Sequence, residues 1–366
     1  MITDEDAGQA PLAAERRAAV LAALERDGVV RVAALTEELG VTAVTVRRDI
    51  ARLEQEGLLE RVHGGAVAVP GGTPSAPAPV TGTIGVMVPS LDYYWPGVVR
   101  GMELEARKHG LRVVLRGSSY DAQDERPMLE RLVSAERLAG LVVAPRTIGP
   151  GASDVVEWLA ASGVPHVLVE REASRAPHHE LLESVVSDHA LGALMAVHHL
   201  AELGHRRVGL VLSRQSPTSR RIAAGWKAAC AELGLSADEH FERLTPDSSR
   251  PEYPRVVDEV VQTALASGTT ALLVHSDPDA FAVVQHAQDR GLSVPGDLSI
   301  VAYDDEVAGM FSPALTAVSP PREWVGHAAV DVLVKRIADP SRPVHRTFIS
   351  PRLVVRDSTG PVVPTT

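Results

Sequence analysis

Residues 41–69, with the sequence VTAVTVRRDIARLEQEGLLERVHGGAVAV, predict a helix followed directly by a short hairpin. Thr42 can cap this helix, because its hydroxyl can accept a hydrogen bond from a backbone amide of the first turn. Three apolar residues recur at helical spacing and should pack against a core: Val46, Ile50 and Leu53. Three polar residues recur at the same spacing on another face of the helix: Thr45, Arg48 and Arg52.

The hairpin begins after Gly57, which ends the helix. Residues 58–62 and 66–69 are typical of two short strands. The segment His63-Gly64-Gly65 joins them with glycines, which tolerate the positive φ angles of a tight turn. Arg61 and His63 would then lie along this wing and point toward the phosphate groups of a nucleic acid.

Two further helices are predicted upstream, over residues 12–27 and 32–39, and Gly40 occupies the turn before Thr42. This order of parts is that of a winged helix-turn-helix domain, in which the last helix enters the major groove of DNA and reads base edges. The candidate DNA contacts are Thr42, Thr45, Arg47, Arg48, Arg52, Arg61, His63 and Gly64.

A simpler alternative is that the arginines only solvate a helix face and pair with the neighbouring acids Asp49, Glu54 and Glu56. This alternative does not account for the turn, the cap and the wing. Residues 1–70 carry eight Arg and no Lys against twelve acids, so the charge of the whole domain does not favour DNA. Residues 41–48, however, contain two arginines and no acid, so a local positive surface is expected there.

The first seventy residues resemble the DNA-binding domain of DeoR-type bacterial transcriptional regulators. The pattern of that family is a Thr-hydrophobe-Arg-Arg-Asp start, a glycine that ends the helix and an Arg-x-His-Gly-Gly-Ala wing. The matching residues are Thr45, Arg47, Arg48, Asp49, Gly57, Arg61, His63, Gly64, Gly65 and Ala66. The resemblance implies a DNA-binding domain over residues 1–69.

A chain of 366 residues is longer than one hydrophobic core usually supports, so two or three domains are expected. Hydrophobic residues make up 45% and charged residues 23%, which is ordinary for a soluble globular protein. The formal net charge of −11 argues against nonspecific binding of the whole molecule to nucleic acid or to an anionic membrane.

The single cysteine, Cys230, permits no internal disulfide and is expected to be a small buried apolar residue in a reducing compartment. The amino terminus is acidic and lacks a basic leader followed by an apolar run, so no secretory signal is predicted. No apolar stretch is long enough to cross a bilayer. We therefore expect a cytoplasmic protein that does not use a membrane.

Residues 70–82, PGGTPSAPAPVTG, are rich in Pro, Gly, Ala, Ser and Thr and predict an extended linker. Beyond it, short apolar strands alternate with helices, a rhythm that predicts an α/β core with parallel sheets covered by helices. The rhythm pauses at residues 185–188 and restarts, so the core, residues 83–358, should have two lobes with a ligand cleft between them. Residues 359–366 are expected to be a tail.

The core resembles the effector-binding domain of LacI/GalR-type repressors, which shares its fold with periplasmic sugar-binding proteins. The resembling runs include TIGVMVPSLDYYWPGVVRGMELEARKHG, LAELGHRRVGLV, HSDPDAFAVVQHAQDRGLSVPGDLSIVAYDDE and SPALTAVSPPREWVGHAAVDVL. A DeoR-type head departs from the usual LacI/GalR head. The short DNA-contacting hinge helix of that family has no counterpart in residues 70–82, so its ordering switch does not carry over.

The LacI/GalR resemblance implies several effector contacts. Asp304, in the Tyr-Asp-Asp turn, corresponds to an acid that accepts hydrogen bonds from ligand hydroxyls, and an ionised carboxylate suits a polyol. Ser276 corresponds to a ligand-contacting loop position, and Glu170 ends a first-lobe strand that faces the cleft. The alternative for each carboxylate is a loop cap or an ion pair.

Two further groups are candidate effector contacts. Arg220 or Arg221 corresponds to a family arginine before the Gly225-Trp226 pair, with the choice left open, and the alternative is that both are surface charges. An aromatic cluster in a chain with only 4% aromatics is typical of a stacking platform for a sugar ring, or else it fastens its loop to the following helix. This cluster comprises Ser90, Tyr93, Tyr94 and Trp95. Trp158, Trp226 and Trp324 lie in amphipathic helices and are expected in the core.

The sequence has no catalytic or metal-binding motif that we recognise. His179-Glu180 is followed by Glu183 where a zinc-protease helix needs a second histidine. His198 and His199 are adjacent and would point about 100 degrees apart on a helix, so they do not chelate together. A nucleophile elbow, a phosphate-binding loop and a dinucleotide fingerprint are missing. We expect no enzyme, no metal and no cofactor.

The sequence therefore predicts a ligand-responsive transcriptional regulator that acts as a repressor. Its expected partners are double-stranded operator DNA, a small sugar or related polyol, and a second copy of the chain in a homodimer or a higher even oligomer. One alternative is a sugar-binding sensor whose amino-terminal domain recruits a protein partner, and another is an enzyme on the same two-lobed fold.

Overall fold

The computed structural model describes residues 13–55, 58–62, 64–67, 82–118, 125–147, 149, 151–235 and 241–362. Contacts divide the chain into two units, Met1–Ala78 and Pro79–Thr366, which we call the head and the core. The predicted linker lies outside the described residues except for Gly82, which begins the first strand of the core. Residues 359–362, expected in a tail, are instead bonded to the core: the Gly360 carbonyl lies 3.1 Å from Nε2 of His205.

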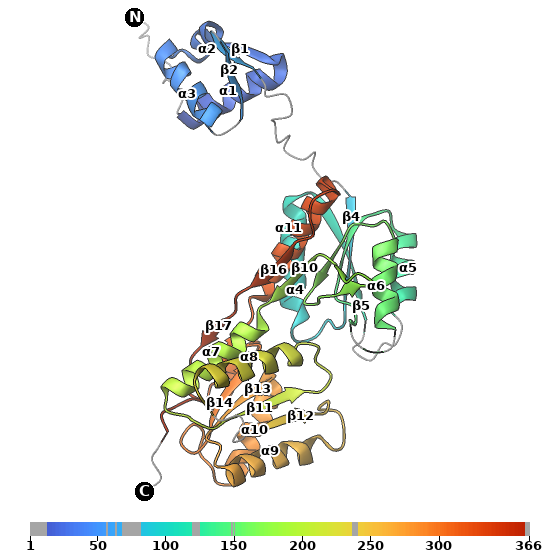
Figure 1. Ribbon diagram of the computed structural model, residues 1–366, viewed down its shortest axis with the longest axis vertical. Coiled ribbons are helices and arrows are strands. Elements are labelled where there is room, and N and C mark those ends of the chain that lie inside the picture. Colours follow the sequence, from blue (N-terminus) through green and yellow to red (C-terminus); the bar gives the residue numbers. More distant parts are fainter. Residues whose placement is uncertain are drawn as a thin grey trace, which may run out of the picture. The chain divides into compact units, whose positions relative to one another are not determined.

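The head contains three helices and a small antiparallel sheet of order β1-β3-β2 (Figure 1). Its elements are α1 (Ala13–Asp27), β1 (Val29–Arg31), α2 (Val32–Leu39), α3 (Ala43–Gln55), β2 (Glu60–Val62) and β3 (Gly65–Val67). The sequence did not predict β1, a three-residue strand whose only buried side chain is Val30. The winged helix-turn-helix order is otherwise as predicted.

Helix α3 packs as its periodicity predicts. The predicted core-facing residues are at most 2% exposed: Val46, Ile50 and Leu53. Thr42 caps the helix, since its Oγ1 accepts a hydrogen bond of 3.3 Å from the Thr45 amide. At the wing, Gly64 has a φ of +85°, and a Cβ on Gly65 would lie 1.9 Å from the Val30 carbonyl oxygen. Strand β1 therefore requires glycine at position 65.

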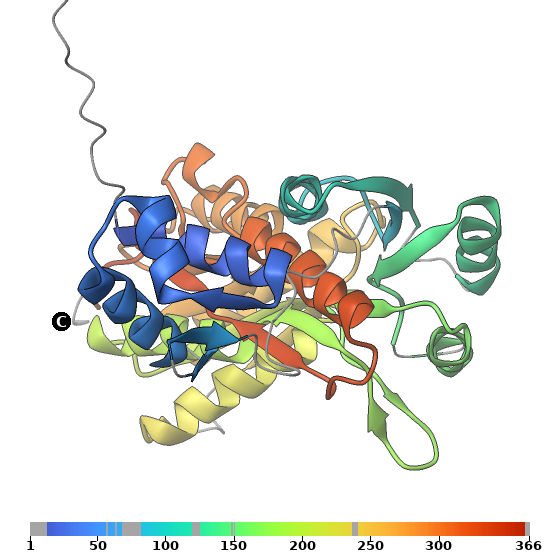
Figure 2. The ribbon, with the colours of Figure 1, turned by 90° about the horizontal axis from the view of Figure 1, so that it is seen from above.

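The first lobe of the core contains a parallel sheet of order β16-β10-β7-β6-β4-β5. Its strands are β4 (Gly82–Val88), β5 (Leu111–Gly117), β6 (Leu138–Val143), β7 (His166–Val169), β10 (Ser184–Ser187) and β16 (Arg346–Ile349). Helices α4 (Trp95–Lys108) and α11 (Arg322–Ala338) cover one face, while α5 (Arg126–Ala135) and α6 (Ala152–Ala161) cover the other (Figure 2). A small hairpin, β8 (Ser174–Arg175) and β9 (Glu180–Leu181), follows β7.

The second lobe contains a sheet of order β12-β11-β13-β14-β15-β17. Its strands are β11 (Val208–Ser213), β12 (Glu242–Thr245), β13 (Ala271–His275), β14 (Ser299–Tyr303), β15 (Thr316–Ser319) and β17 (Arg352–Val354). Helices α7 (His189–Glu202) and α8 (Ser219–Glu232) cover one face, and α9 (Tyr253–Ser267) and α10 (Asp277–Asp289) the other. The sheets are parallel as predicted, except that β17 pairs antiparallel to β15 at one edge of the second lobe.

The two lobes are not two consecutive halves of the sequence. The chain passes from the first lobe to the second after β10, returns after β15 to form α11 and β16, and crosses again to form β17. Three connections therefore join the two lobes. Of the tryptophans expected in the core, Trp226 is buried and Trp158 is partly buried, but Trp324 is 69% exposed, so that expectation is wrong for Trp324.

Candidate functional site

The exposed face of α3 carries positive charge that nearby acids do not neutralise. Arg47 and Arg48 are exposed, and neither forms an ion pair or hydrogen bond with the described part of the chain. Asp49, which follows them, is buried and pairs with Arg16 of α1, with Nε and Oδ2 2.9 Å apart. Asp49 therefore does not pair with Arg47 or Arg48, as one part of the alternative supposed, while the alternative that these arginines only solvate the helix face is left open. A positive surface lies where a helix of this type meets DNA.

The wing lies next to this face and encloses a concave surface with it. A cavity of about 520 Å³ is lined by residues of α3 and of the wing, among them Arg47, Arg61 and Gly64. The exposed Arg61 lies 3.7 Å from Glu54, which is a weak surface ion pair. Thr45 shares a hydrogen bond of 2.9 Å with the capping Thr42. Arg52 is exposed on α3, and His63 lies outside the described residues.

The core has a cavity of about 550 Å³ walled by both lobes, which we call the effector cavity. Six of the predicted effector contacts line it: Tyr93, Tyr94, Trp95, Glu170, Ser276 and Asp304. They come from the loop before α4, the end of β7, the end of β13 and the end of β14. Because the strands of both sheets end here, residues distant in sequence meet at one place. Tyr93, Glu170 and Asp304 have positive φ angles, and backbone strain of this kind gathers at functional sites.

Glu170 is a buried carboxylate held by four hydrogen bonds. Its oxygens accept from the Tyr94 hydroxyl at 2.7 Å, from the Ser187 hydroxyl at 2.7 Å and from the Ser187 amide at 3.1 Å, and Nε2 of His189 lies at 3.2 Å. Burial alone would raise the pKa of Glu170, but the hydrogen bonds from His189, Tyr94 and Ser187 outweigh it and lower the pKa to about 2. Glu170 therefore stays ionised and forms a firmly held part of the cavity wall.

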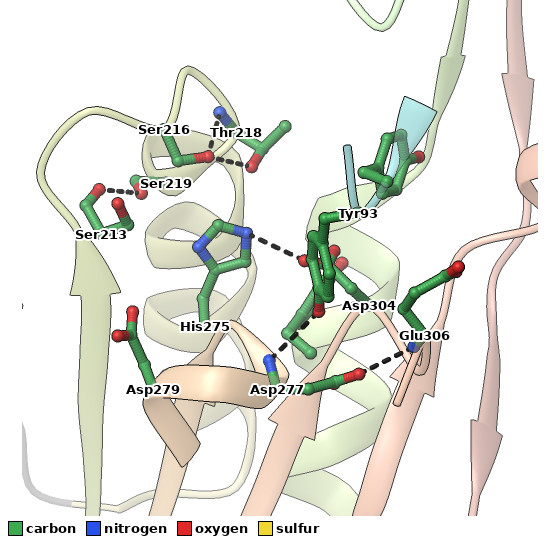
Figure 3. Close-up of polar contacts among 12 residues, drawn as sticks. Tyr93, Ser213, Ser216, Thr218, Ser219, His275, Asp277, Asp279, Asp304 and Glu306 are labelled. Atoms are coloured by element: carbon green, nitrogen blue, oxygen red, sulfur yellow. Dashed lines mark hydrogen bonds and ion pairs between the residues drawn. The ribbon is translucent and has the colours of Figure 1, made fainter. Parts of the chain in front are cut away.

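Asp304 is buried as deeply as Glu170 but has no comparable set of donors. Its nearest basic group is the His275 ring, with Nε2 3.8 Å from Oδ2 (Figure 3). Burial, followed by the charge of Asp277, raises the pKa of Asp304 to about 7. Ligand hydroxyls that donate hydrogen bonds to this buried carboxylate would stabilise its ionised form.

The backbone around Asp304 is fixed by two charged residues. Asp277 accepts hydrogen bonds from four successive amides of the loop after β14, those of residues 305–308, at 2.7 to 3.1 Å (Figure 3). Arg322, at the start of α11, donates to the carbonyl oxygens of Asp304 and Asp305. These contacts fix the backbone from which the Asp304 side chain reaches the cavity wall.

The remaining predicted effector residues do not line the effector cavity. The Ser90 hydroxyl accepts a hydrogen bond of 2.9 Å from the Asp92 amide and shapes its loop. Arg221 forms an ion pair with Glu172 and lies over the Phe348 ring, and Arg220 lines a neighbouring cavity. Trp95 lines the cavity but is only 1% exposed, which agrees with the alternative that it fastens the loop to α4.

Residues that the sequence did not single out also line this cavity, among them Arg171, His189, His275 and Asp279. Burial, followed by the charge of His189, lowers the pKa of His275 to about 3, and its Nδ1 has no hydrogen-bond partner within the described chain. Asp279 accepts from the Tyr253 and Thr245 hydroxyls. His275 is the last residue of β13, and Arg171 is the second residue after β7. Because ligands bind at the carboxyl ends of such strands, this position in the sequence could have identified both residues as site candidates.

Over the described ranges, the chain has neither a metal site nor a membrane-spanning helix. Within them, no group of His, Cys, Asp and Glu is arranged to hold a metal ion. None of the helices described is both long and apolar enough to traverse a bilayer. Cys230 is buried among apolar side chains, as predicted, and burial raises the pKa of its thiol to about 11.

Comparisons with known proteins agree with both parts of the chain. Residues 16–70 match the DeoR-like helix-turn-helix domain, and residues 197–359 match the periplasmic binding protein-like domain. The chain is 31% identical to the HTH-type transcriptional regulator MalR of Streptomyces coelicolor, over 76% of this chain and 81% of the relative. It is 28% identical to the arabinose metabolism transcriptional repressor of Geobacillus stearothermophilus, over 86% of each.

A solved structure has the same core fold. The LacI family transcriptional regulator from Mycobacterium smegmatis is 27% identical to this chain, with a TM-score of 0.61, and the match covers 76% of this chain and 100% of that one. These comparisons confirm the predicted combination of a helix-turn-helix head with a two-lobed core. The relatives are transcriptional regulators and not enzymes.

Proposed function

The chain belongs to the LacI family of helix-turn-helix transcriptional regulators, and we propose that it is a repressor whose operator affinity is controlled by a small sugar or related polyol. In this proposal a DeoR-type head binds the operator and a LacI/GalR-type core binds the effector. The likeness to a repressor of arabinose metabolism supports both the repressing action and the class of effector. Binding to operator DNA implies that the protein works in the cytoplasm.

The head would contact DNA through α3 and the wing. Arg47 and Arg48, with the neighbouring Thr42 and Thr45, enter the major groove from the exposed face of α3. The wing, with Arg61 and Gly64, contacts the adjacent backbone or the minor groove. The outward Arg47 and Arg48 beside an inward Asp49 support this assignment, because the head as a whole is acidic.

The single observation that carries the effector assignment is the cavity walled by both lobes, which combines aromatic side chains with carboxylates. Its volume of about 550 Å³ lies within the range of small-molecule sites. Asp304 and the unpaired Nδ1 of His275 offer hydrogen-bonding groups to ligand hydroxyls from the second lobe. Tyr93 and Tyr94 offer aromatic surface from the first lobe.

A ligand that contacts both lobes would favour their closed arrangement by its difference in affinity for the two states. The three crossings between the lobes would guide this closure. In a homodimer, two heads bind two operator half-sites, so a change in core geometry alters the spacing of the heads and with it the affinity for DNA.

The test is a gel-shift experiment with the full-length protein and genomic fragments, repeated with a panel of neutral sugars. We expect retention of specific fragments at moderate salt and a change in retention with at least one sugar. Failure to retain any fragment would favour the alternative of a sugar sensor that acts through a protein partner. Retention that no sugar changes would contradict the effector part of the proposal. Product analysis after incubation with the same sugars tests for an enzyme.

A further inference from the structure

A second cavity adjoins the effector cavity and differs from it in charge. It has a volume of about 950 Å³ and is lined by residues at the carboxyl ends of strands from both lobes, among them Pro89, Ala144 and Leu212. The two cavities share Arg171, the last residue of β11, Ser213, and three residues of the loop between β11 and α8: Gln215, Ser216 and Pro217. A ligand that extends past this loop therefore contacts both cavities.

The second cavity is strongly basic, so we call it the cationic cavity. Five cations line it against one acid, Glu242; the cations are Arg146, Arg171, Arg214, Arg220 and Lys227. The effector cavity has the opposite balance, with a single arginine, Arg171, against five acids: Asp92, Glu170, Asp247, Asp279 and Asp304. In a chain with a formal net charge of −11, a cavity with four excess positive charges is unusual.

Two of the five cations of this cavity, Arg214 and Arg220, are available for a ligand. Lys227 pairs with Glu242 at 3.3 Å, but Arg214 and Arg220 are exposed and their guanidinium groups form no ion pair or hydrogen bond with the described part of the chain. Arg171 is 6% exposed; it donates hydrogen bonds to the carbonyl oxygens of Pro145 and Glu170, at 3.2 and 2.7 Å, and lies over the Trp95 ring. No carboxylate of the described chain pairs with it, so an anionic ligand group would add the missing opposite charge.

The shared loop adds donors at the boundary of the two cavities. The Ser216 and Thr218 hydroxyls lie 2.8 Å apart directly before α8, whose N-terminal end carries a partial positive charge (Figure 3). Arg220 lies in the first turn of α8 and lines the cationic cavity. Guanidinium groups and hydroxyls around one space are the donor set that binds phosphate, because arginine can donate two parallel hydrogen bonds to it.

We propose that the cationic cavity binds the phosphate group of a phosphorylated sugar whose ring occupies the effector cavity. This inference rests on the proposed function and narrows the effector from a neutral sugar to a sugar phosphate. Arg171 joins the two parts of the site, because it lines both cavities. Arg214 and Arg220 neutralise the phosphate from the second lobe, so the anion also favours closure of the lobes.

The first test uses inorganic phosphate, which probes the cationic cavity without a sugar. We expect millimolar phosphate to raise the Tm of the full-length protein above its Tm in chloride of equal ionic strength. The Arg214→Ala/Arg220→Ala double variant should lose this increment. Arg131→Ala, an exposed arginine on α5, should keep it. An equal increment in the double variant and the wild type would assign it to an adventitious ion only and overturn the proposal.

The second test compares matched ligands by titration calorimetry: glucose with glucose 6-phosphate, ribose with ribose 5-phosphate, and gluconate as a sugar acid. The best phosphate ester should bind about tenfold or more tightly than its free sugar, and the preference should vanish in the double variant. A free sugar or a sugar acid that binds at least as tightly as the esters would overturn the proposal.

Operator retention separates this inference from the proposed function. If free sugars alter retention and phosphate esters do not, the cationic cavity is wrongly assigned while sugar control of the operator stands. If phosphate stabilises the wild type selectively but no sugar of either kind alters retention, the anion site stands and the proposed sugar control of the operator fails.

Discussion

The head and the core use charged side chains in opposite ways. On α3 of the head, Arg47 and Arg48 are exposed, and the acid beside them points inward to a partner. In the core, Glu170 and Asp304 are buried at the cavity wall, where their surroundings shift their pKa values in opposite directions. Under the proposed function, the exposed charges of α3 would contact the DNA polyanion, whereas the buried charges of the core would contact one small ligand in a fixed geometry.

The largest expected effect tests the exposed side of this comparison. The Arg47→Ala/Arg48→Ala double variant should lose roughly a thousandfold in operator affinity, because each contact is worth about 1–3 kcal/mol. The operator affinity of this variant should also depend less steeply on salt concentration, since fewer counterions are released on binding. Titrations of an operator fragment at several salt concentrations measure both. Arg26→Ala, in which an exposed arginine that pairs with Asp27 is removed, is the matched control. Unchanged affinity would contradict the assignment of α3.

The next effect concerns a buried charge. Glu170→Gln should destabilise the core by about 3 kcal/mol at neutral pH, the value of a pKa lowered from 4.5 to about 2. A depressed pKa gives stability that is present above pH 4.5 and is lost as the pH falls toward 2, so the difference from wild type should shrink over that window. Urea unfolding at several pH values measures it. Glu252→Gln, at an exposed position, should show neither effect. A pH-independent difference would mean that packing and not charge is lost.

Asp304 should behave in the opposite sense. A carboxyl group with its pKa raised from 3.8 to about 7 makes the folded state less stable as the pH rises between those values. Asp304→Asn removes this cost, so its stability relative to wild type should increase by about 2 kcal/mol between pH 5.5 and pH 7. The variant should also lose the effector response. Asp289→Asn, at an exposed position, is the control, and a constant difference across this window would contradict the account of Asp304.

The smallest expected effect returns to the head. Thr42→Ala removes the capping hydroxyl of α3 and should destabilise the head by about 1 kcal/mol, whereas Thr42→Ser should retain the cap. Hydrogen exchange of the α3 amides in the full-length protein measures this change without interference from the core. Equal protection in Thr42→Ala and wild type would show that the cap does not limit the opening of α3.

The head could be predicted from the sequence because its organisation is local. The spacing of three apolar residues, Val46, Ile50 and Leu53, predicts the packed face of one helix. Thr42 indicates where that helix begins. Strand β1 escaped prediction, since three residues are too few to show an alternating pattern. The inward turn of Asp49 also depends on Arg16, which lies on another helix.

The effector cavity could be predicted only in part because its residues meet through the fold. Asp304 and Glu170 were found through a family resemblance, and Tyr94 through composition. His275 and Asp279 were not predicted as site residues. Their side chains form contacts with residues distant in sequence, such as that of Asp279 with Tyr253, and no local pattern shows such contacts. The return of α11 and β16 to the first lobe was equally hidden, since a local strand or helix pattern does not say which sheet it joins.

The crossing of the chain between the lobes has a consequence for the order of synthesis. Strand β16 completes an edge of the first lobe, so that lobe is incomplete until residue 349 has left the ribosome. The described elements of the head are complete by residue 67. During translation the DNA-binding head is therefore complete well before the effector-binding core. Premature termination would leave a fragment that binds DNA but that no effector regulates.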